Sequence, residues 1–259
     1  METISHGGRK TAYEQAGGDR MGASVLYVHG SGANRGVWDA QLEHGTRPGV
    51  ALDLSGHGDS EDVDADAGYE TLSAYADDVL AVANETDSEI LVGNSLGGAV
   101  LLHLVLERDV SPSGLVLAGT GAKLAVMEDL LEWFETDFER AIDFLHGSGL
   151  LFHDPDPAAL ERSETTMREV GQEVTRRDFR SCHTFDVRRR LDEIDAPVLA
   201  LCGEYDGLTP PRYHEYFAEN IPTSEFVVLP DAAHLAMIER SEAFNDALDG
   251  FLDRIENGA

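Results

Sequence analysis

The sequence predicts an α/β fold: a mostly parallel, doubly wound sheet with a helical segment inserted between two of its strands. Short runs rich in valine and leucine alternate with helical patterns, as in sheets that helices cover on both faces. One segment, residues 121–195, breaks this alternation because it holds helical patterns and no convincing strand. A chain of 259 residues is long enough to bury the core of one such domain.

The individual elements follow from local patterns along the chain. The residues before HGGR and the run TAYEQAGG, up to residue 18, predict an N-terminal hairpin. Short β-rich runs predict further strands within residues 24–30, 49–60, 89–94, 114–120, 196–206 and 225–234. Helical periodicity predicts helices over residues 69–86, 96–108, 211–220 and about 239–255. Residues 1–120 and 196–259 should therefore form the sheet domain.

The inserted segment, residues 121–195, is expected to form a helical cap. Apolar residues recur at helical spacing from Met127 to Leu145, which predicts one long amphipathic helix. A second helical stretch is expected over residues 157–176. The apolar stripe of the first helix favours a packing seam over a cofactor site, and the cap should cover the site of the sheet domain.

The charge balance of the chain is strongly acidic. Lysine and arginine total 19, aspartate and glutamate total 49, and the formal net charge is −30. Such a surface repels phosphates and anionic lipids, so nucleic acid and membrane are not expected partners. With only Lys10 and Lys123 as lysines, the composition favours adaptation to a salt-rich solution over a merely acidic protein.

Neither a signal peptide nor a membrane-spanning segment is expected. The N-terminus lacks the apolar region of a signal peptide, and the apolar runs are too short to span a bilayer. A soluble cytoplasmic protein is expected, as a monomer or homodimer that acts on a small molecule.

Neither a metal nor a cofactor is expected. No pair of histidines at i, i+4 resembles a zinc site, no GxGxxG follows a strand, and GxxxxGK[ST] is absent. The two cysteines, Cys182 and Cys202, provide no disulfide framework. Cys202 lies in an apolar run, which favours a small buried side chain, but the sequence leaves a disulfide between the two open.

Ser95 stands where a strand is expected to turn into a helix, in the stretch ILVGNSLGGAV. Gly93 and Gly97 flank it at the two positions where a strained turn leaves no room for Cβ. The N–H of Leu96, at the start of the helix, would point into the same space as the serine hydroxyl. Glycine-flanked serines are common, so on this motif alone a structural serine fits as well.

Two more polar residues follow expected strands further along the chain. Asp206 lies at the end of the run PVLALCGEYD, just past the expected strand. His234 lies at the end of EFVVLPDAAH, just past the next one. Taken singly, Asp206 fits an Asx turn and His234 a loop or helix cap. Because carboxyl ends of parallel strands share one edge of a sheet, the order Ser, Asp, His indicates one catalytic site for acyl transfer.

These motifs resemble the α/β-hydrolase family over essentially the whole chain. The resemblance rests on HGSG from residue 29, DLSGHGDS from residue 53, GNSLGG from residue 93, GEYDGLTP from residue 203 and DAAH from residue 231. It implies that Ser95 is the nucleophile, His234 the general base and Asp206 the acid that orients it. The resemblance also implies an oxyanion hole made by the N–H groups of Ser31 and Leu96.

The nucleophile narrows the expected reaction. Dehalogenases and epoxide hydrolases of this family use aspartate and dienelactone hydrolases use cysteine, so Ser95 favours a carboxylesterase-like serine hydrolase that acts through an acyl-enzyme. A C–C bond hydrolase or a menaquinone-pathway-like lyase remains an alternative, although C–C hydrolases typically carry tryptophan where this chain has Leu235. A non-catalytic binding protein on the same fold is the alternative of another class.

Aromatic and basic residues suggest how a substrate binds. Trp38, Trp133 and Phe134 are candidates for an apolar pocket, which would suit a small to medium acyl group. Arginines gather between Arg176 and Arg190; a salt-bridged surface is the simpler interpretation, and a receptor for a substrate carboxylate is the sharper one.

Two further histidine motifs are interpreted as structural. A second HGSG, residues 146–149, follows a helical pattern rather than a strand, which indicates a helix end and a loop. The resemblance implies that His57 in SGHGDS shapes its loop, and no oriented acid is evident beside it.

Overall fold

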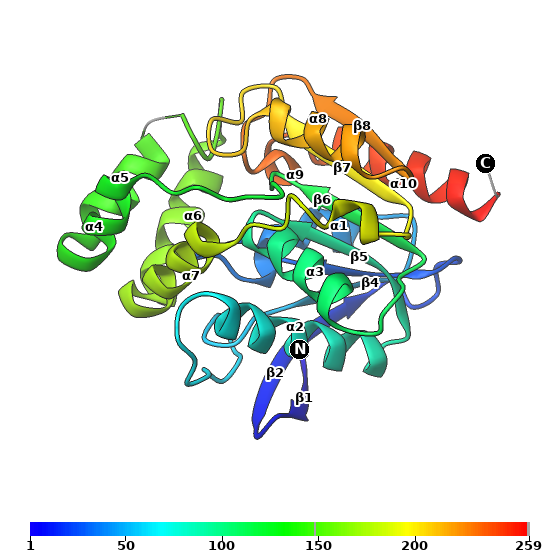
Figure 1. The fold of residues 1–259 in the computed structure, drawn as a ribbon, viewed down its shortest axis with the longest axis horizontal. Coiled ribbons are helices and arrows are strands. Elements are labelled where there is room, and N and C mark those ends of the chain that lie inside the picture. Colours follow the sequence, from blue (N-terminus) through cyan, green and yellow to red (C-terminus); the bar gives the residue numbers. More distant parts are fainter. Residues whose placement is uncertain (148, 258–259) are drawn as a thin grey trace.

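The protein forms one eight-stranded sheet in the order β1-β2-β4-β3-β5-β6-β7-β8 (Figure 1). The structure is a computed structural model that describes residues 1–147 and 149–257. Its strands are β1 (Glu2–His6), β2 (Arg9–Ala16), β3 (Ser24–Val28), β4 (Gly49–Leu52), β5 (Ser88–Asn94), β6 (Gly114–Ala118), β7 (Val198–Gly203) and β8 (Ser224–Leu229). β2 pairs antiparallel with β1 and β4, and the other pairs are parallel. The predicted hairpin and mostly parallel sheet are confirmed.

Helices cover both faces of the sheet. The helices of the sheet domain are α1 (Asp39–His44), α2 (Tyr69–Glu85), α3 (Leu96–Glu107), α8 (Pro211–Asn220), α9 (Ala236–Glu239) and α10 (Ser241–Glu256). Leu26 and Val28 of β3 point into a core shared with α2, α3 and α8, whereas Val25 and Tyr27 point into the core beneath α1 and α10. This alternation is the period of two that a strand buried on both faces requires. The short helices α1 and α9 were not expected from the sequence.

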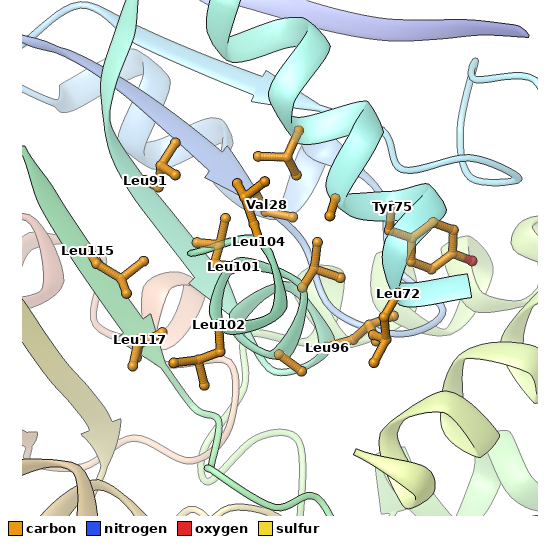
Figure 2. Packing of buried hydrophobic residues seen from close by; sticks show 14 of the residues in the cluster. Val28, Leu72, Tyr75, Leu91, Leu96, Leu101, Leu102, Leu104, Leu115 and Leu117 are labelled. Carbon is orange, nitrogen blue, oxygen red and sulfur yellow. The ribbon is translucent and has the colours of Figure 1, made fainter. Parts of the chain in front are cut away.

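The first of these cores holds α2 and α3 against the middle of the sheet. Figure 2 shows leucines of α3 filling the space between β5, β6 and α2. α3 is apolar on all sides because strands lie below it and α2 lies beside it. The turn that begins α3 therefore stands on a rigid base.

Four helices lie between β6 and β7, in the segment that was expected to be helical. They are α4 (Glu128–Thr136), α5 (Phe138–Gly147), α6 (Pro157–Val170) and α7 (Gln172–Thr184). Figure 1 shows them gathered on one side of the molecule, next to the sheet domain. We call these four helices the helical insertion.

The prediction of one long helix from Met127 to Leu145 was wrong, and the helical stretch expected over residues 157–176 falls into two helices. The backbone leaves the helical conformation at Asp137, which separates α4 from α5. Gly171 has a φ of +85°, a backbone conformation that residues with a side chain rarely adopt, and it separates α6 from α7. An apolar spacing continues across both breaks, so periodicity alone did not reveal them.

The structure also bears on the predicted state of the two cysteines and on whether a helix could cross a membrane. Cys182 and Cys202 are both buried and free, so the disulfide that the sequence left as a possibility is not formed. Within residues 1–147 and 149–257, no helix combines the length and the apolar character that crossing a bilayer requires.

Candidate active site

Four loops meet at the edge of the sheet where the parallel strands end. β5 leads directly into Ser95, β7 is followed three residues later by Asp206, and β8 is followed by His234. The loop after β3, residues 29–34, lies beside them; we call it the β3 loop. A Cβ added to Gly30 in this loop would lie 3.0 Å from the Cβ of Ser95, so the β3 loop touches the serine turn.

The turn at Ser95 is strained and closely packed. Ser95 has φ 54° and ψ −117°, which is unusual for a residue with a side chain. A Cβ on Gly93 would lie 2.6 Å from the backbone of Gly97, and one on Gly97 would lie 2.4 Å from the carbonyl oxygen of Val28. Both glycines are therefore sterically required, as the motif suggested, and the turn lifts Ser95 above the end of the strand.

Asp206 and His234 form a buried hydrogen-bonded pair. The Nδ1 of His234 lies 3.0 Å from the Oδ2 of Asp206. The backbone N–H groups of Leu208 and Thr209 donate to Oδ1, at 2.9 and 2.8 Å, and the Thr209 hydroxyl donates to Oδ2. Burial raises the pKa of Asp206, but the charge of His234 and these donors outweigh it, so the pKa lies below its ordinary value. The carboxylate is thus ionised and oriented.

Ser95 and His234 line the same cavity, and Asp206, which does not line it, contacts the Nδ1 of His234. Asn94, the residue before Ser95, donates through Nδ2 to the carbonyl oxygen of His234 at 3.4 Å. The strand end that carries the serine is thereby linked to the loop that carries the histidine. The chain thus brings together all three predicted residues at one site; their catalytic roles stay a prediction.

The two predicted oxyanion donors belong to segments that adjoin Ser95: Leu96 follows it in the chain, and Ser31 lines the same cavity. Leu96 is the first residue of α3, and the first N–H groups of a helix have no partner inside it. Ser31 stands in the β3 loop and lines the cavity with Gly30 and Gly32. The helix N-terminus adds a partial positive charge that favours an anion at this place.

A cavity of about 750 Å³ opens in front of Ser95. The β3 loop and the loop before α9 form one wall, and α6 with part of α7 forms the other. Apolar side chains come from both walls: Leu151, Met167, Phe179, Leu208, Leu235 and Met237. Asp39, Glu161 and Arg162 add charge to the same lining.

The three predicted pocket aromatics do not line this cavity. Trp38 is fully buried and packs on Tyr27 and Phe244, and Phe134 is fully buried against Phe179. Trp133 packs on Phe144 beneath the guanidinium of Arg140. Large aromatic side chains fill core space as readily as pocket walls, and composition does not distinguish the two uses.

Most arginines of the arginine-rich stretch form salt bridges, Arg177 from a buried position, and none of them lines the cavity. Arg176 and Arg180 pair with Glu135, and Arg177 pairs with Asp62. Arg188 pairs with Asp186, and Arg190 pairs with Glu107 and Glu193. The cavity instead holds Arg162 of α6, which the sequence analysis did not single out.

The structure corrects the interpretation of His57. An acid does lie beside it: the Oδ2 of Asp178, in α7, is 2.9 Å from the Nε2 of His57, and both side chains are fully buried. These residues are 121 positions apart, so local sequence gave no sign of the pair. In the second HGSG, His146 bonds to Ile142 and Ser163 near the end of α5, as expected, while Ser148 lies outside the described residues.

Within the part of the chain that the structure describes, no three His, Cys, Asp or Glu side chains are arranged to hold a metal ion.

Comparison with known proteins places the fold and the site in context. Residues 25–247 match the model of the alpha/beta hydrolase family. A pimeloyl-[acyl-carrier protein] methyl ester esterase from Neisseria meningitidis serogroup A is 33% identical over 253 residues, which cover 88% of this chain and 78% of that protein. A 3-oxoadipate enol-lactonase from Acinetobacter baylyi is 24% identical and covers 95% of each chain. A solved structure of a thermophilic esterase superposes with a TM-score of 0.86 at 31% identity, covering 98% and 97% of the two chains.

The chain belongs to the α/β hydrolase family. The predictions of this fold and of a carboxylesterase-like hydrolase are confirmed by the family match and by relatives that are named esterases.

Proposed function

We propose that the protein is a serine hydrolase that cleaves carboxylic esters of small to medium apolar acyl compounds. One observation carries the proposal: His234, which forms a buried hydrogen bond with Asp206, lines the same cavity as Ser95 on its strained turn. Nucleophile, base and orienting acid are the three groups that acyl transfer through serine requires.

In the proposed mechanism, Ser95 and His234 act twice. The imidazole accepts the proton of Ser95 while Oγ attacks the ester carbonyl carbon, and the N–H groups of Ser31 and Leu96 bind the oxyanion. The alcohol leaves with the proton from His234, which gives an acyl-enzyme. Water then loses a proton to His234 as it attacks the acyl carbon. The bond between that carbon and Oγ breaks, His234 returns the proton to Oγ, and the acid product departs. Asp206 keeps the imidazole in the tautomer that faces the serine.

The cavity supports an apolar acyl group next to a polar entrance. Leucine, methionine and phenylalanine side chains line its walls, and Asp39, Glu161 and Arg162 are exposed where α6 meets the sheet domain. We infer that the helical insertion serves as a cap, because α6 supplies much of one cavity wall.

A panel of substrates tests the proposal. It should contain p-nitrophenyl esters of increasing acyl length, methyl esters, lactones and thioesters, since the relatives are named for a methyl ester and an enol-lactone. We expect p-nitrophenyl esters to release a rapid burst of about one p-nitrophenol per protein, because the acyl-enzyme forms before it is hydrolysed. A fluorophosphonate should label Ser95, as peptide mass mapping would show. A protein that hydrolyses no member of the panel and takes up no phosphonate at Ser95 would instead be the binding protein of the alternative class.

We further propose that the acidic surface adapts the protein to concentrated salt. Carboxylates outnumber cations by 49 to 19, so most have no cation to pair with. Between 0.01 M and 1 M salt the screening length falls from about 30 Å to about 3 Å, which removes most of their mutual repulsion. We expect Tm to rise by about 5 °C or more over that range of KCl. For a chain of this size, such a shift corresponds to a gain of a few kcal/mol in the free energy of unfolding. Sucrose at equal osmolality is the control for excluded solute, and a Tm that stays level or falls in KCl contradicts the proposal.

A further inference from the structure

A buried polar cluster joins the helical insertion to the β3 loop, outside the triad. At its centre is Asp178 of α7, which is fully buried and does not line the cavity. Its Oδ2 accepts the N–H of Gly32 at 3.3 Å and lies 2.9 Å from the Nε2 of His57. Its Oδ1 accepts the hydroxyl of Tyr75 at 2.8 Å. Figure 2 shows the Tyr75 hydroxyl pointing away from the leucine core. Both oxygens of the carboxylate are thus used.

The charges of this cluster make Asp178 a strong acceptor. Both ring nitrogens of His57 face acceptors, Nε2 the carboxylate and Nδ1 the carbonyl oxygen of Ser55 at 3.2 Å, and only an imidazolium can donate to both. Burial lowers the pKa of His57, but the charge and hydrogen bond of Asp178 outweigh it, so the pKa is raised above its ordinary value. An ionised carboxylate with a buried counter-ion holds an N–H more firmly than a neutral acceptor does.

α7 contacts two consecutive residues of the β3 loop. Cys182 lies four residues after Asp178, on the same face of the helix, and its Sγ is 3.7 Å from the Oγ of Ser31. Asp178 holds the next residue, Gly32, by its N–H. Gly32 has φ +63°, and a Cβ there would lie 3.0 Å from Met167 of α6. The insertion therefore encloses the loop at the position that follows the predicted oxyanion donor.

We propose that Asp178 is a positioning residue for the oxyanion hole: by holding the peptide between Ser31 and Gly32, it aims the N–H of Ser31 at the reacting carbonyl and makes catalysis depend on the seated helical insertion. This inference rests on the proposed ester hydrolysis. An oxyanion donor works only within a narrow range of distance, so a loop that rotates by a fraction of an ångström loses much of its effect. Asp178 acts through the loop and touches no reacting atom.

The variant Asp178→Asn tests the proposal, because an amide of the same shape lacks the charge and offers only one acceptor atom. We expect kcat for an ester to fall by about 10- to 100-fold, approaching the loss of one oxyanion donor. KM should stay within about threefold, because an interaction made mainly in the transition state is lost. The affinity for a trifluoromethyl ketone, which forms an oxyanion on Ser95, should fall by the same factor as kcat. The affinity for the carboxylic acid product should not change.

Asp78→Asn is the matched control. Asp78 of α2 is also fully buried and also accepts a backbone N–H, that of Ser55 at 2.8 Å, but it makes no contact with the β3 loop. It should lower Tm at least as much as Asp178→Asn does and leave kcat and the ketone affinity within about twofold. Equal losses of kcat in both variants, or a loss confined to KM, would overturn the proposal in favour of a merely structural role.

A second variant covers the case in which Asp178→Asn does not fold. His57→Gln keeps a donor for Asp178 but removes its counter-ion, so we expect a smaller fall of kcat and ketone affinity, about 3- to 10-fold, with the product affinity unchanged. An unchanged kcat in His57→Gln would overturn the proposal. A wild-type protein without ester hydrolysis contradicts the proposed function itself, whereas an active wild type with fully active variants contradicts only the role of Asp178.

Discussion

Replacement of Ser95 by alanine is expected to reduce kcat/KM for esters by about 10⁴- to 10⁶-fold, because no acyl-enzyme can form without the hydroxyl. The strained turn should persist, since Gly93 and Gly97 and the packing of α3 define it rather than the serine side chain. KM or inhibitor binding and Tm should therefore change little. Steady-state hydrolysis of a p-nitrophenyl ester, with the burst amplitude and the melting curve, measures all three quantities.

Ser73→Ala is the matched control for this variant. Ser73 of α2 is also half-buried, and its Oγ lies 2.8 Å from the Nε2 of His103, but it lies outside the cavity. It should keep kcat/KM within about twofold, as expected of a change remote from the reacting atoms. If Ser95→Ala retained a tenth or more of the activity, or if Ser73→Ala abolished it, the nucleophile would be misassigned.

The sheet and the serine turn could be predicted from the sequence because local residue patterns determine both. Runs such as SVLYV and EILVGN are short, apolar and β-branched, which suits strands buried on both faces. The glycines around Ser95 are dictated by backbone contacts of 2.4 and 2.6 Å, so they had to appear in the motif. Asp206 and His234 could be placed because carboxyl ends of parallel strands meet at one edge.

The remaining features depend on contacts that no local pattern records. Asp137 and Gly171 interrupt the helical insertion without interrupting its apolar spacing. Trp38 and Phe134 are large and apolar wherever they lie, and only tertiary packing, on Tyr27 and Phe244 for Trp38 and on Phe179 for Phe134, makes them core. His57 and Asp178 meet across 121 positions. Such pairs become visible only once α7 is placed on the sheet domain.

Asp206→Asn is expected to lower kcat by about 10⁴-fold while leaving the fold intact. The Oδ2 of Asp206 accepts from His234 and from the Thr209 hydroxyl, and its Oδ1 accepts two backbone N–H groups. If the asparagine oxygen keeps the backbone donors, its NH₂ must face His234. The Nδ1 of His234 then becomes the acceptor, so its proton moves to Nε2. In the proposed mechanism Nε2 accepts the Ser95 proton, and in this tautomer it can no longer act as a base. The kcat for an ester, measured beside the melting curve, checks this.

A conservative change in the neighbouring loop separates this tautomer effect from general damage. Asp231 lies three residues before His234, is exposed and has φ 54°, a conformation that asparagine tolerates well. Asp231→Asn should therefore keep kcat within about twofold, as surface changes do, although both substitutions convert aspartate to asparagine. Nearly full activity in Asp206→Asn would mean that the buried carboxylate orients nothing in the reaction. Equal losses in the two variants would instead assign the effect to the loop, because of these two aspartates only Asp206 is hydrogen-bonded to the imidazole.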